Sequence, residues 1–135
     1  MMKYFASQGR GLDILFKFVK FGIVGLGGIL VNTLVLFLLY QIARLPLVMA
    51  SAAAVEAAIV NNFVWNNHWT FEERGISLHR FAKFNFVSLG GLVITTLVLY
   101  YLVSSMSVHY LVANLLAVGA GTLWNFGLSL YWTWG

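Results

Sequence analysis

The chain has 135 residues, of which 61% are hydrophobic and only 9% are charged. Soluble domains carry about 25% charged residues, so this composition excludes an ordinary soluble domain and predicts an integral membrane protein. The chain has no cysteine, which excludes disulfides and thiolate metal sites, and its three histidines are too scattered to indicate a metal cluster. We therefore expect no metal and no cofactor. The net charge of +4 comes from basic residues beside apolar runs, which favours contact with a membrane surface over nucleic-acid binding.

The chain opens with a basic segment, residues 1–17, which we expect at the cytoplasmic interface. The apolar run after it is longer than the roughly 7–15 residues of a cleaved signal sequence, and it offers no convincing small-residue cleavage site. We therefore expect it to be kept as a transmembrane helix from Phe18 to Tyr40.

Three further runs are apolar and long enough for helices that cross a bilayer, which takes about 20 residues. They extend from Pro46 to Asn67, from Phe81 to Ser105 and from His109 to Trp132. Pro46 is the only proline, and at the start of a helix its missing N–H costs little. The sequence thus predicts an all-α integral membrane protein of the cell membrane, with four transmembrane helices in a single membrane domain, residues 1–135.

Basic residues indicate how these helices are oriented. Only Arg44 lies between the first and second spans, and the connection after the third span has no lysine or arginine. The other seven of the eight basic residues precede or open the first span, or surround the connection between the second and third: Lys3, Arg10, Lys17, Lys20, Arg74, Arg80 and Lys83. The positive-inside rule then predicts that both termini and the loop 72–80 are cytoplasmic.

An internal repeat links the two halves of the chain at a constant offset of 63 residues. "FVKFGIVGLGGILVNTLVLFLL" from Phe18 aligns without a gap with "FAKFNFVSLGGLVITTLVLYYL" from Phe81, and 12 of the 22 pairs are identical. The offset continues to the ends of both halves, so repeat one covers residues 18–71 and repeat two covers residues 81–134. Since each repeat has two spans, both enter from the same side, which predicts parallel repeats about an axis along the membrane normal.

Small residues spaced four apart form a ridge on the second helix of each repeat. The two ridges are Ala50, Ala54, Ala58, Asn62 and Asn66, and Ala113, Ala117, Gly121, Asn125 and Ser129. Such ridges allow close helix packing in lipid, and glycines at every third position of the first span, Gly22, Gly25 and Gly28, favour the same interpretation. Asn62 and Asn125 are then either interhelical hydrogen-bonding groups, worth about 0.6 kcal/mol each, or part of a polar cavity.

Glu56 is the only acidic residue inside a span, and its counterpart in the repeat is Gly119. A carboxyl at that depth costs at least ~2.5 kcal/mol by insertion scales, so it needs a polar surrounding. We expect either a functional role, as a proton-coupling group or a hydrogen-bond acceptor in a cavity, or membership of a structural network.

Lys20 and Lys83 occupy equivalent ends of two spans, with Lys17 and Arg80 one turn earlier. These cations either anchor the helix ends by snorkelling to the interface or bind the phosphate of a lipid headgroup.

The stretch "NNFVWNNHWTF", residues 61–71, combines asparagines, aromatic rings and a histidine. Its tryptophans fit an interfacial aromatic belt, together with Trp132 and Trp134, but tryptophan beside asparagine also suits the rim of a sugar site. Asn61, Asn67 and His68 do not recur in repeat two. Together with Glu56 they are therefore candidates for recognising a ligand asymmetrically, in repeat one only.

This stretch and the "FVKFGIVGLGG" opening resemble the GtrA-like family of small membrane proteins, over about Phe16 to Trp134. The family closes its second span with an N-F-x-x-N-[RK]-x-[WY]-x-F pattern. In this sequence the pattern falls on Asn62, Phe63, Asn66, Asn67, Trp69 and Phe71. Asn67 is the departure, because the family usually has a basic residue at that position.

The resemblance implies a flippase that moves a polyprenyl-phosphate-linked sugar to the outer leaflet for cell-surface polysaccharide synthesis, beside a membrane glycosyltransferase. Lys20, Lys83, Arg80 and Lys17 would then hold the lipid phosphate. The sugar would contact Asn61, Asn62, Asn66, Asn67, His68 and Trp69, with Glu56 and Asn125 in the polar cavity. The alternatives are a membrane anchor that recruits the glycosyltransferase and a small proton-coupled drug exporter, which the strong charge bias disfavours. We expect no enzymatic activity, because no catalytic motif or pair of carboxylates is present, and we expect a homo-oligomer, because four helices enclose little volume.

Overall fold

The computed structural model describes residues 2–135, with side chains from Gly9 onward. Met1 lies outside this range, as does the side chain of Lys3, one of the cations behind the predicted orientation. The described chain forms four long helices, α1 (Met2–Phe37), α2 (Leu47–Trp65), α3 (Leu78–Ser104) and α4 (Tyr110–Leu128). Three of them continue into one turn of π-helix, namely η1 (Leu38–Ile42) after α1, η2 (Asn66–Thr70) after α2 and η3 (Ser129–Thr133) after α4.

Four helical stretches are long and apolar enough to cross a membrane: Gly9–Ile42, Leu47–Thr70, Leu78–Ser104 and Tyr110–Thr133. The predicted all-α fold with four membrane spans is therefore confirmed, and the protein is a multi-pass membrane protein. The 24 residues of the second and fourth stretches give about 36 Å of helix, enough for a hydrocarbon core about 30 Å thick. The 36 residues of α1 reach about 54 Å, so α1 extends well beyond the bilayer.

Local sequence sets where the helices begin. Pro46 is the N-cap of α2, with a φ of −54° that the proline ring favours. Ser77 caps α3, where its hydroxyl oxygen accepts a hydrogen bond from the backbone N–H of Arg80 at 3.2 Å. His109 caps α4 through its Nδ1, which accepts from the N–H of Leu111 at 3.2 Å.

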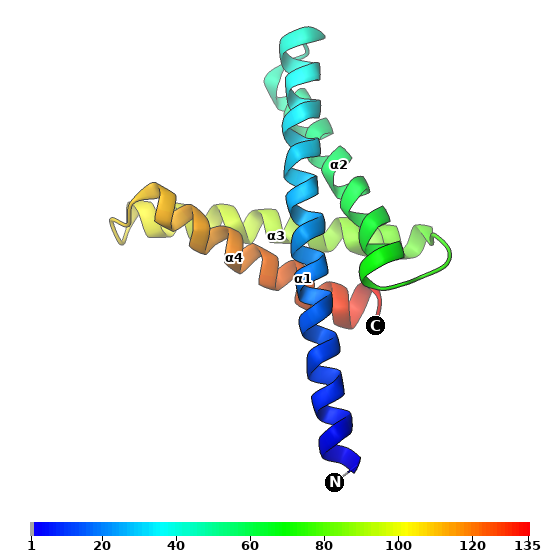
Figure 1. Ribbon diagram of the computed structural model, residues 1–135. Coiled ribbons are helices and arrows are strands. Elements are labelled where there is room, and N and C mark those ends of the chain that lie inside the picture. The colour runs from blue at the N-terminus through cyan, green and yellow to red at the C-terminus, as the bar shows by residue number, and fades with distance from the viewer. Residues whose placement is uncertain (1) are drawn as a thin grey trace. The chain divides into compact units, whose positions relative to one another are not determined.

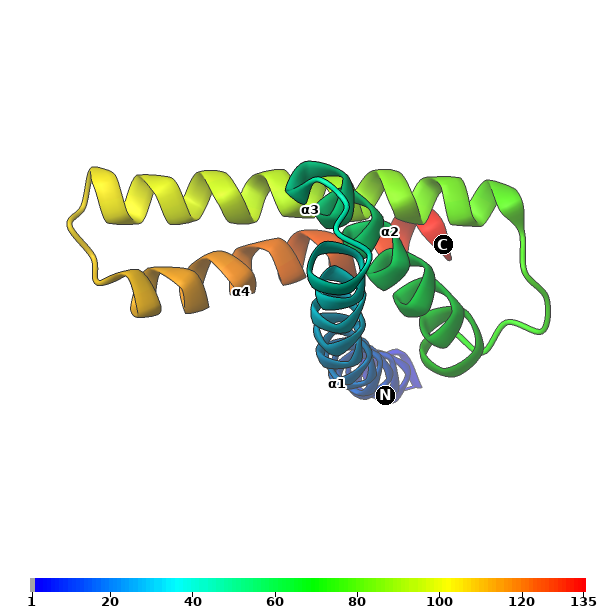
Figure 2. The same cartoon turned by 90° about the horizontal axis from the view of Figure 1, so that it is seen from above.

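The chain divides into two compact units, Met1–Ile76 (unit 1) and Ser77–Gly135 (unit 2), with the boundary inside the predicted 72–80 loop. In unit 1, α2 runs back along α1, and in unit 2, α4 runs back along α3 (Figures 1 and 2). Two pairs of elements begin 63 residues apart: α2 and α4, at Leu47 and Tyr110, and η2 and η3, at Asn66 and Ser129. The single membrane domain, the parallel arrangement and the cytoplasmic termini stay predictions.

Both units pack through small residues, as the ridges predict. Ala50 and Ala54 are fully buried in unit 1, Ala113 and Ala117 are fully buried in unit 2, and Ala58 and Gly121 continue the two seams. Buried phenylalanine and valine on the facing helix complete each seam at equivalent positions, Phe21 and Val24 in unit 1 and Phe84 and Val87 in unit 2. A buried phenylalanine follows each ridge on its own helix, Phe63 on α2 and Phe126 on α4. Small side chains let the two helix backbones approach closely. The resulting van der Waals packing drives helix association in lipid, where the hydrophobic effect between helices is absent.

The glycines of α1 do not all serve this packing. A Cβ on Gly28 would collide with the side-chain amide of Asn62, so the two helices are in close contact there. A Cβ on Gly22 or Gly25 would meet nothing within 4 Å. Within unit 1, Gly28 is thus the one of the three glycines that is in tight contact with α2, and close packing of Gly22 and Gly25 stays a prediction.

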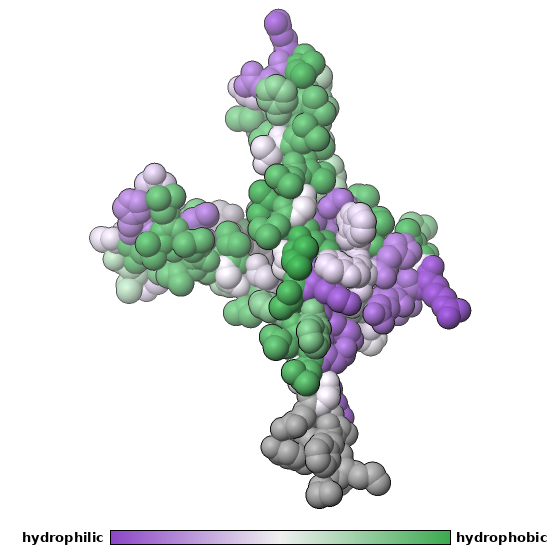
Figure 3. Space-filling view, in the orientation of Figure 1, coloured by the Kyte–Doolittle hydropathy of each residue, from purple (hydrophilic) through white to green (hydrophobic). Residues whose placement is uncertain are grey.

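Apolar side chains cover the outer faces of the helices, as the hydrophobic colouring in Figure 3 shows for one face. Leu30 on α1 is 73% exposed and Leu115 on α4 is 74% exposed. Such surface is costly in water but suits a lipid surrounding, so the burial pattern agrees with the membrane assignment.

Candidate functional site

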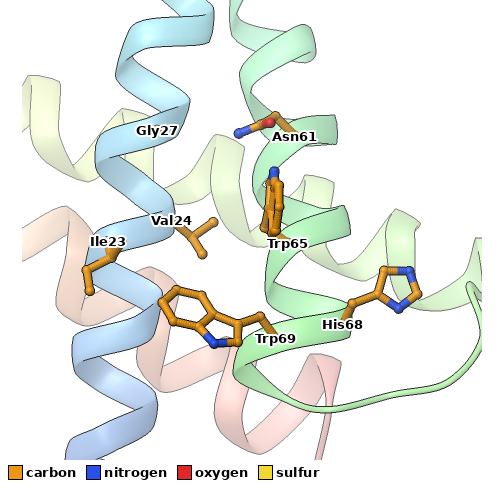
Figure 4. A pocket seen from close by; sticks show the side chains of 7 residues that line it. All are labelled: Ile23, Val24, Gly27, Asn61, Trp65, His68 and Trp69. Carbon is orange, nitrogen blue, oxygen red and sulfur yellow. The ribbon is translucent and has the colours of Figure 1, made fainter.

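A pocket of about 590 Å³ lies in unit 1, between α1 and the end of α2 with its π-helical turn η2. Its size is within the ~300–1,000 Å³ of small-molecule sites. The pocket is lined by Ile23, Val24 and Gly27 of α1 and by Asn61, Trp65, His68 and Trp69 of α2 and η2. Figure 4 shows Val24 and both indole rings between the two helices, while the His68 ring points away from α1 in this view.

Helical spacing brings the polar and aromatic lining together. Asn61, Trp65 and Trp69 are four residues apart and therefore share one side of the helix that faces α1. Sequence reasoning placed Asn61, His68 and Trp69 at the site but assigned Trp65 to an interfacial belt, and it omitted the lining residues of α1. The four-residue spacing is the signal that identifies Trp65.

Lys20 does not line the pocket but lies next to one of its lining residues, Trp69, and we call this side of the pocket its mouth. Its Nζ lies 5.6 Å from the centre of the Trp69 ring, within range of a cation–π interaction, and 3.9 Å from Oε1 of Glu72. Glu72 adopts a φ of +53°, which ends the helical run after η2 and places its carboxylate near α1. The carboxylate is mostly exposed, so the ion pair is worth about 0.2–1 kcal/mol and is easily exchanged for another anion.

The pocket also offers hydrogen-bonding groups at two positions, His68 in η2 and Asn61 nearer the middle of α2. Nδ1 of His68 lies 3.2 Å from the carbonyl oxygen of Glu73, which can only accept, so Nδ1 carries the hydrogen. Nε2 is the second hydrogen-bonding atom of the ring. Asn61, half-buried deeper along α2, presents both a donor and an acceptor. Two indole rings beside such groups can stack on a flat apolar face while hydroxyls are hydrogen-bonded.

Asn62 lies on the neighbouring face of α2, against Gly28, and lines a smaller cavity of about 220 Å³ with Asn32 and Thr33. Asn125 of unit 2 lies against Gly91 in the same way. The side-chain oxygens of both asparagines are buried without a hydrogen-bond partner. Both residues therefore sit at a tight helix–helix contact of their unit, and neither lines the larger pocket.

Asn66 and Asn67 are buried, and their side chains are bonded to the π-helical turn η2 and to the loop that follows it. Oδ1 of Asn66 accepts a hydrogen bond from the Thr70 hydroxyl at 2.7 Å, and Nδ2 of Asn67 donates to the carbonyl oxygen of Gly75 at 3.0 Å. These bonds hold the turn that presents His68 and Trp69. The two asparagines thus position the pocket rather than line it.

The other predicted site residues lie elsewhere in their units. Lys17 pairs with Asp13 at 3.1 Å and faces the ring of Phe71 at 5.9 Å. Lys83 faces Trp132 at 5.3 Å in unit 2, the counterpart of Lys20 with Trp69.

Arg80 lies in the first turn of α3, and Glu56 is exposed on α2, outside the lining of either cavity. Within the described chain, no three histidine or acidic side chains are grouped as metal ligands would be.

Two known proteins are similar to this chain in sequence. A dolichol-phosphate mannosyltransferase of Pyrococcus furiosus is 38% identical over 120 residues, which are 87% of this chain and 34% of that protein, so the chain spans about a third of that relative. A Bacillus subtilis protein described as uncharacterized membrane protein YngA is 33% identical over 122 residues, 86% of this chain and 78% of that protein. The family described as GtrA/DPMS, transmembrane domain, matches residues 20–134, a range that covers most of unit 1, nearly all of unit 2 and the whole pocket. The chain therefore belongs to the GtrA/DPMS transmembrane domain family.

Proposed function

We propose that the protein translocates a polyprenyl-phosphate-linked sugar from the cytoplasmic to the outer leaflet of the cell membrane, for glycosylation of cell-surface polysaccharide. The observation that carries this proposal is the pocket of unit 1, which combines an apolar wall, two tryptophans and a lysine at its mouth. A lipid-linked sugar has the matching parts, a prenyl chain, a sugar ring and a phosphate between them.

In this proposal Lys20 receives the phosphate. Its present anion, the exposed carboxylate of Glu72, binds it weakly, so a phosphate that enters the mouth can replace Glu72 at small cost. The prenyl chain extends along Ile23 and Val24 of α1, whose apolar surface continues into the lipid. Lys83, Arg80 and Lys17 as further phosphate ligands stay predictions.

The sugar ring lies between the tryptophans. Trp65 is 58% exposed and Trp69 is 39% exposed, so both rings have area to give to a ligand. Asn61 and His68 provide the hydrogen bonds that a sugar's hydroxyls need when they leave water, since an unpaired buried hydroxyl would be costly. The mannosyltransferase relative makes mannose the first sugar to test.

The test is translocation of dolichyl phosphate mannose in liposomes that contain the purified protein. Periodate, which does not cross the bilayer, oxidises only outward-facing mannose, so flipping appears as a rise in the oxidised fraction with time. We expect Lys20→Gln to slow the rise and Arg44→Gln, which removes a cation between the first and second spans that no proposal assigns to the site, to leave it nearly unchanged. A rate equal to that of protein-free liposomes would overturn the proposal.

A second candidate function is membrane anchoring of a glycosyltransferase. In the Pyrococcus relative the matching segment is only about a third of a protein called a mannosyltransferase, which favours a partner of that class. In this case the pocket would hold the partner's lipid substrate or product without moving it. Retention of a glycosyltransferase by a chain that does not scramble lipid in liposomes would select this function. In both cases we propose that this chain binds the lipid-linked sugar and catalyses no reaction.

We also propose that the protein acts as a homo-oligomer. The pocket opens at the surface of one unit and does not enclose a sugar on its way through the hydrocarbon core. A polar headgroup in transit needs walls on every side, which further copies would supply. Native mass spectrometry of the extracted protein would give the number of copies.

A further inference from the structure

The two units differ at the positions that form the pocket. Adding 63 to the number of each lining residue gives its counterpart in unit 2, and Val24, Gly27 and Trp69 are matched by Val87, Gly90 and Trp132. The other four positions change: Ile23, Asn61, Trp65 and His68 are matched by Phe86, Trp124, Leu128 and Tyr131. The largest increase in volume is from Asn61 to Trp124.

Trp124 occupies the space that corresponds to the pocket. Its Nε1 donates a hydrogen bond to the carbonyl oxygen of Val87 at 3.0 Å, and the indole covers Gly90, where a Cβ would come within 3.0 Å of Nε1. Val87 and Gly90 are the counterparts of Val24 and Gly27, which form the pocket wall in unit 1. There the corresponding contact is looser, since a Cβ on Gly27 would lie 4.0 Å from Nδ2 of Asn61.

Other contacts in unit 2 reinforce this closure. Val87 is fully buried, whereas Val24 keeps 6% exposure beside the pocket. Phe86 packs edge-to-face on Trp132, with ring centres 6.1 Å apart, and Lys83 lies over the same indole. Trp132, the counterpart of Trp69, is thus contacted by a neighbouring ring in unit 2, while its exposed fraction, 42%, stays close to the 39% of Trp69.

We propose that Trp124 is a built-in plug, and that each chain therefore binds one lipid-linked sugar, in unit 1 only. This inference rests on the proposed function for the identity of the ligand, but the plug itself can be tested without one. It makes position 61 and its counterpart 124 the residues that decide which unit is a binding site.

Single cysteines report on the plug, because the natural chain has none. Val24→Cys and Val87→Cys are matched probes of the two walls, and each replaces valine with a smaller side chain. We compare their modification by methyl methanethiosulfonate in detergent micelles, using intact mass. Modification at 24 should be about tenfold faster than at 87 because thiol reactivity follows access. Asn61→Trp should slow the reaction at 24, and Trp124→Asn should speed the reaction at 87.

Counting bound ligands tests the claim that each chain has one binding site, in unit 1. The ligand is citronellyl mannosyl phosphate, a short-chain polyprenyl phosphate mannose. We expect native mass spectrometry to show one bound molecule per chain, none after Asn61→Trp, and protection of the cysteine at 24. Equal modification at 24 and 87, or no effect of either partner substitution, would overturn the plug.

Two bound molecules per chain would overturn the one-site inference and leave the proposed function standing. No bound molecule, with the difference in cysteine modification intact, would overturn the proposed ligand and leave the plug standing. Variants that elute with the parent on gel filtration are the ones compared, and the Asn61→Trp arm decides the question if Trp124→Asn does not fold.

Discussion

Replacing Gly28 with alanine is expected to destabilise unit 1 by separating α1 from α2. The added Cβ would overlap Oδ1 of Asn62 and lie 2.7 Å from its Nδ2 and 2.8 Å from its Cγ, where ordinary contacts begin at 3.4 Å. The Asn62 side chain or the helix backbone must therefore move by at least about 0.7 Å, and overpacking of this kind typically costs about 1–3 kcal/mol.

The matched control is Gly25→Ala, three residues earlier on the same helix. Its Cβ would meet nothing within 4 Å, so the change adds helix propensity without a clash and should be neutral or stabilising by up to ~1 kcal/mol. Unfolding in mixed SDS micelles, followed by circular dichroism, measures both variants. Gly28→Ala combined with Asn62→Ala should regain most of the loss, since the second change removes the colliding atoms. Equal stability of Gly28→Ala and Gly25→Ala would refute the close contact.

Three predictions concern binding of citronellyl mannosyl phosphate, measured by calorimetry in micelles. Lys20→Gln should weaken it by about tenfold to a hundredfold, since a charge-assisted bond is worth about 1.5–3 kcal/mol, and an unchanged Kd would remove Lys20 from the site. Glu72→Gln should strengthen it by about twofold, because the carboxylate that competes with phosphate is gone, and weaker binding would show that Glu72 helps the ligand instead. Trp65→Ala should weaken it by roughly 1 kcal/mol, about fivefold, whereas Trp132→Ala in unit 2 should have little effect, and equal losses would contradict the assignment of the sugar to unit 1.

Much of the fold follows from the sequence because membrane helices obey strong local constraints. Every backbone polar group in lipid must be bonded within the chain, so an apolar run of sufficient length has to be a helix. Pro46 marked the start of α2 because a proline at that position has no N–H to leave unpaired. The four-residue spacing of Ala50, Ala54 and Ala58 predicted the buried seam. The predicted ends were less accurate, since α2 gives way to a π-helical turn at Asn66.

The site was only partly predictable, because its geometry depends on what the facing helix leaves open. Lys20 and Trp69 are 49 positions apart in sequence, and only the packing of α1 on α2 places the ammonium over the indole. Asn66 and Asn67 look like ligands in the sequence, yet in the structure the Asn66 amide accepts from Thr70 in the turn and the Asn67 amide donates to Gly75 in the loop after it.

The sequence by itself determined a four-helix membrane protein, the 63-residue correspondence between its halves and the residue types near the end of the second helix, because these follow from hydropathy, identity and spacing along one chain. Only the tertiary structure decided that Asn61 and Trp124, one pair in that correspondence, have opposite effects. A small side chain leaves a cavity and a large one fills it only in relation to the helix opposite, and that relation is set by packing between residues far apart in the chain.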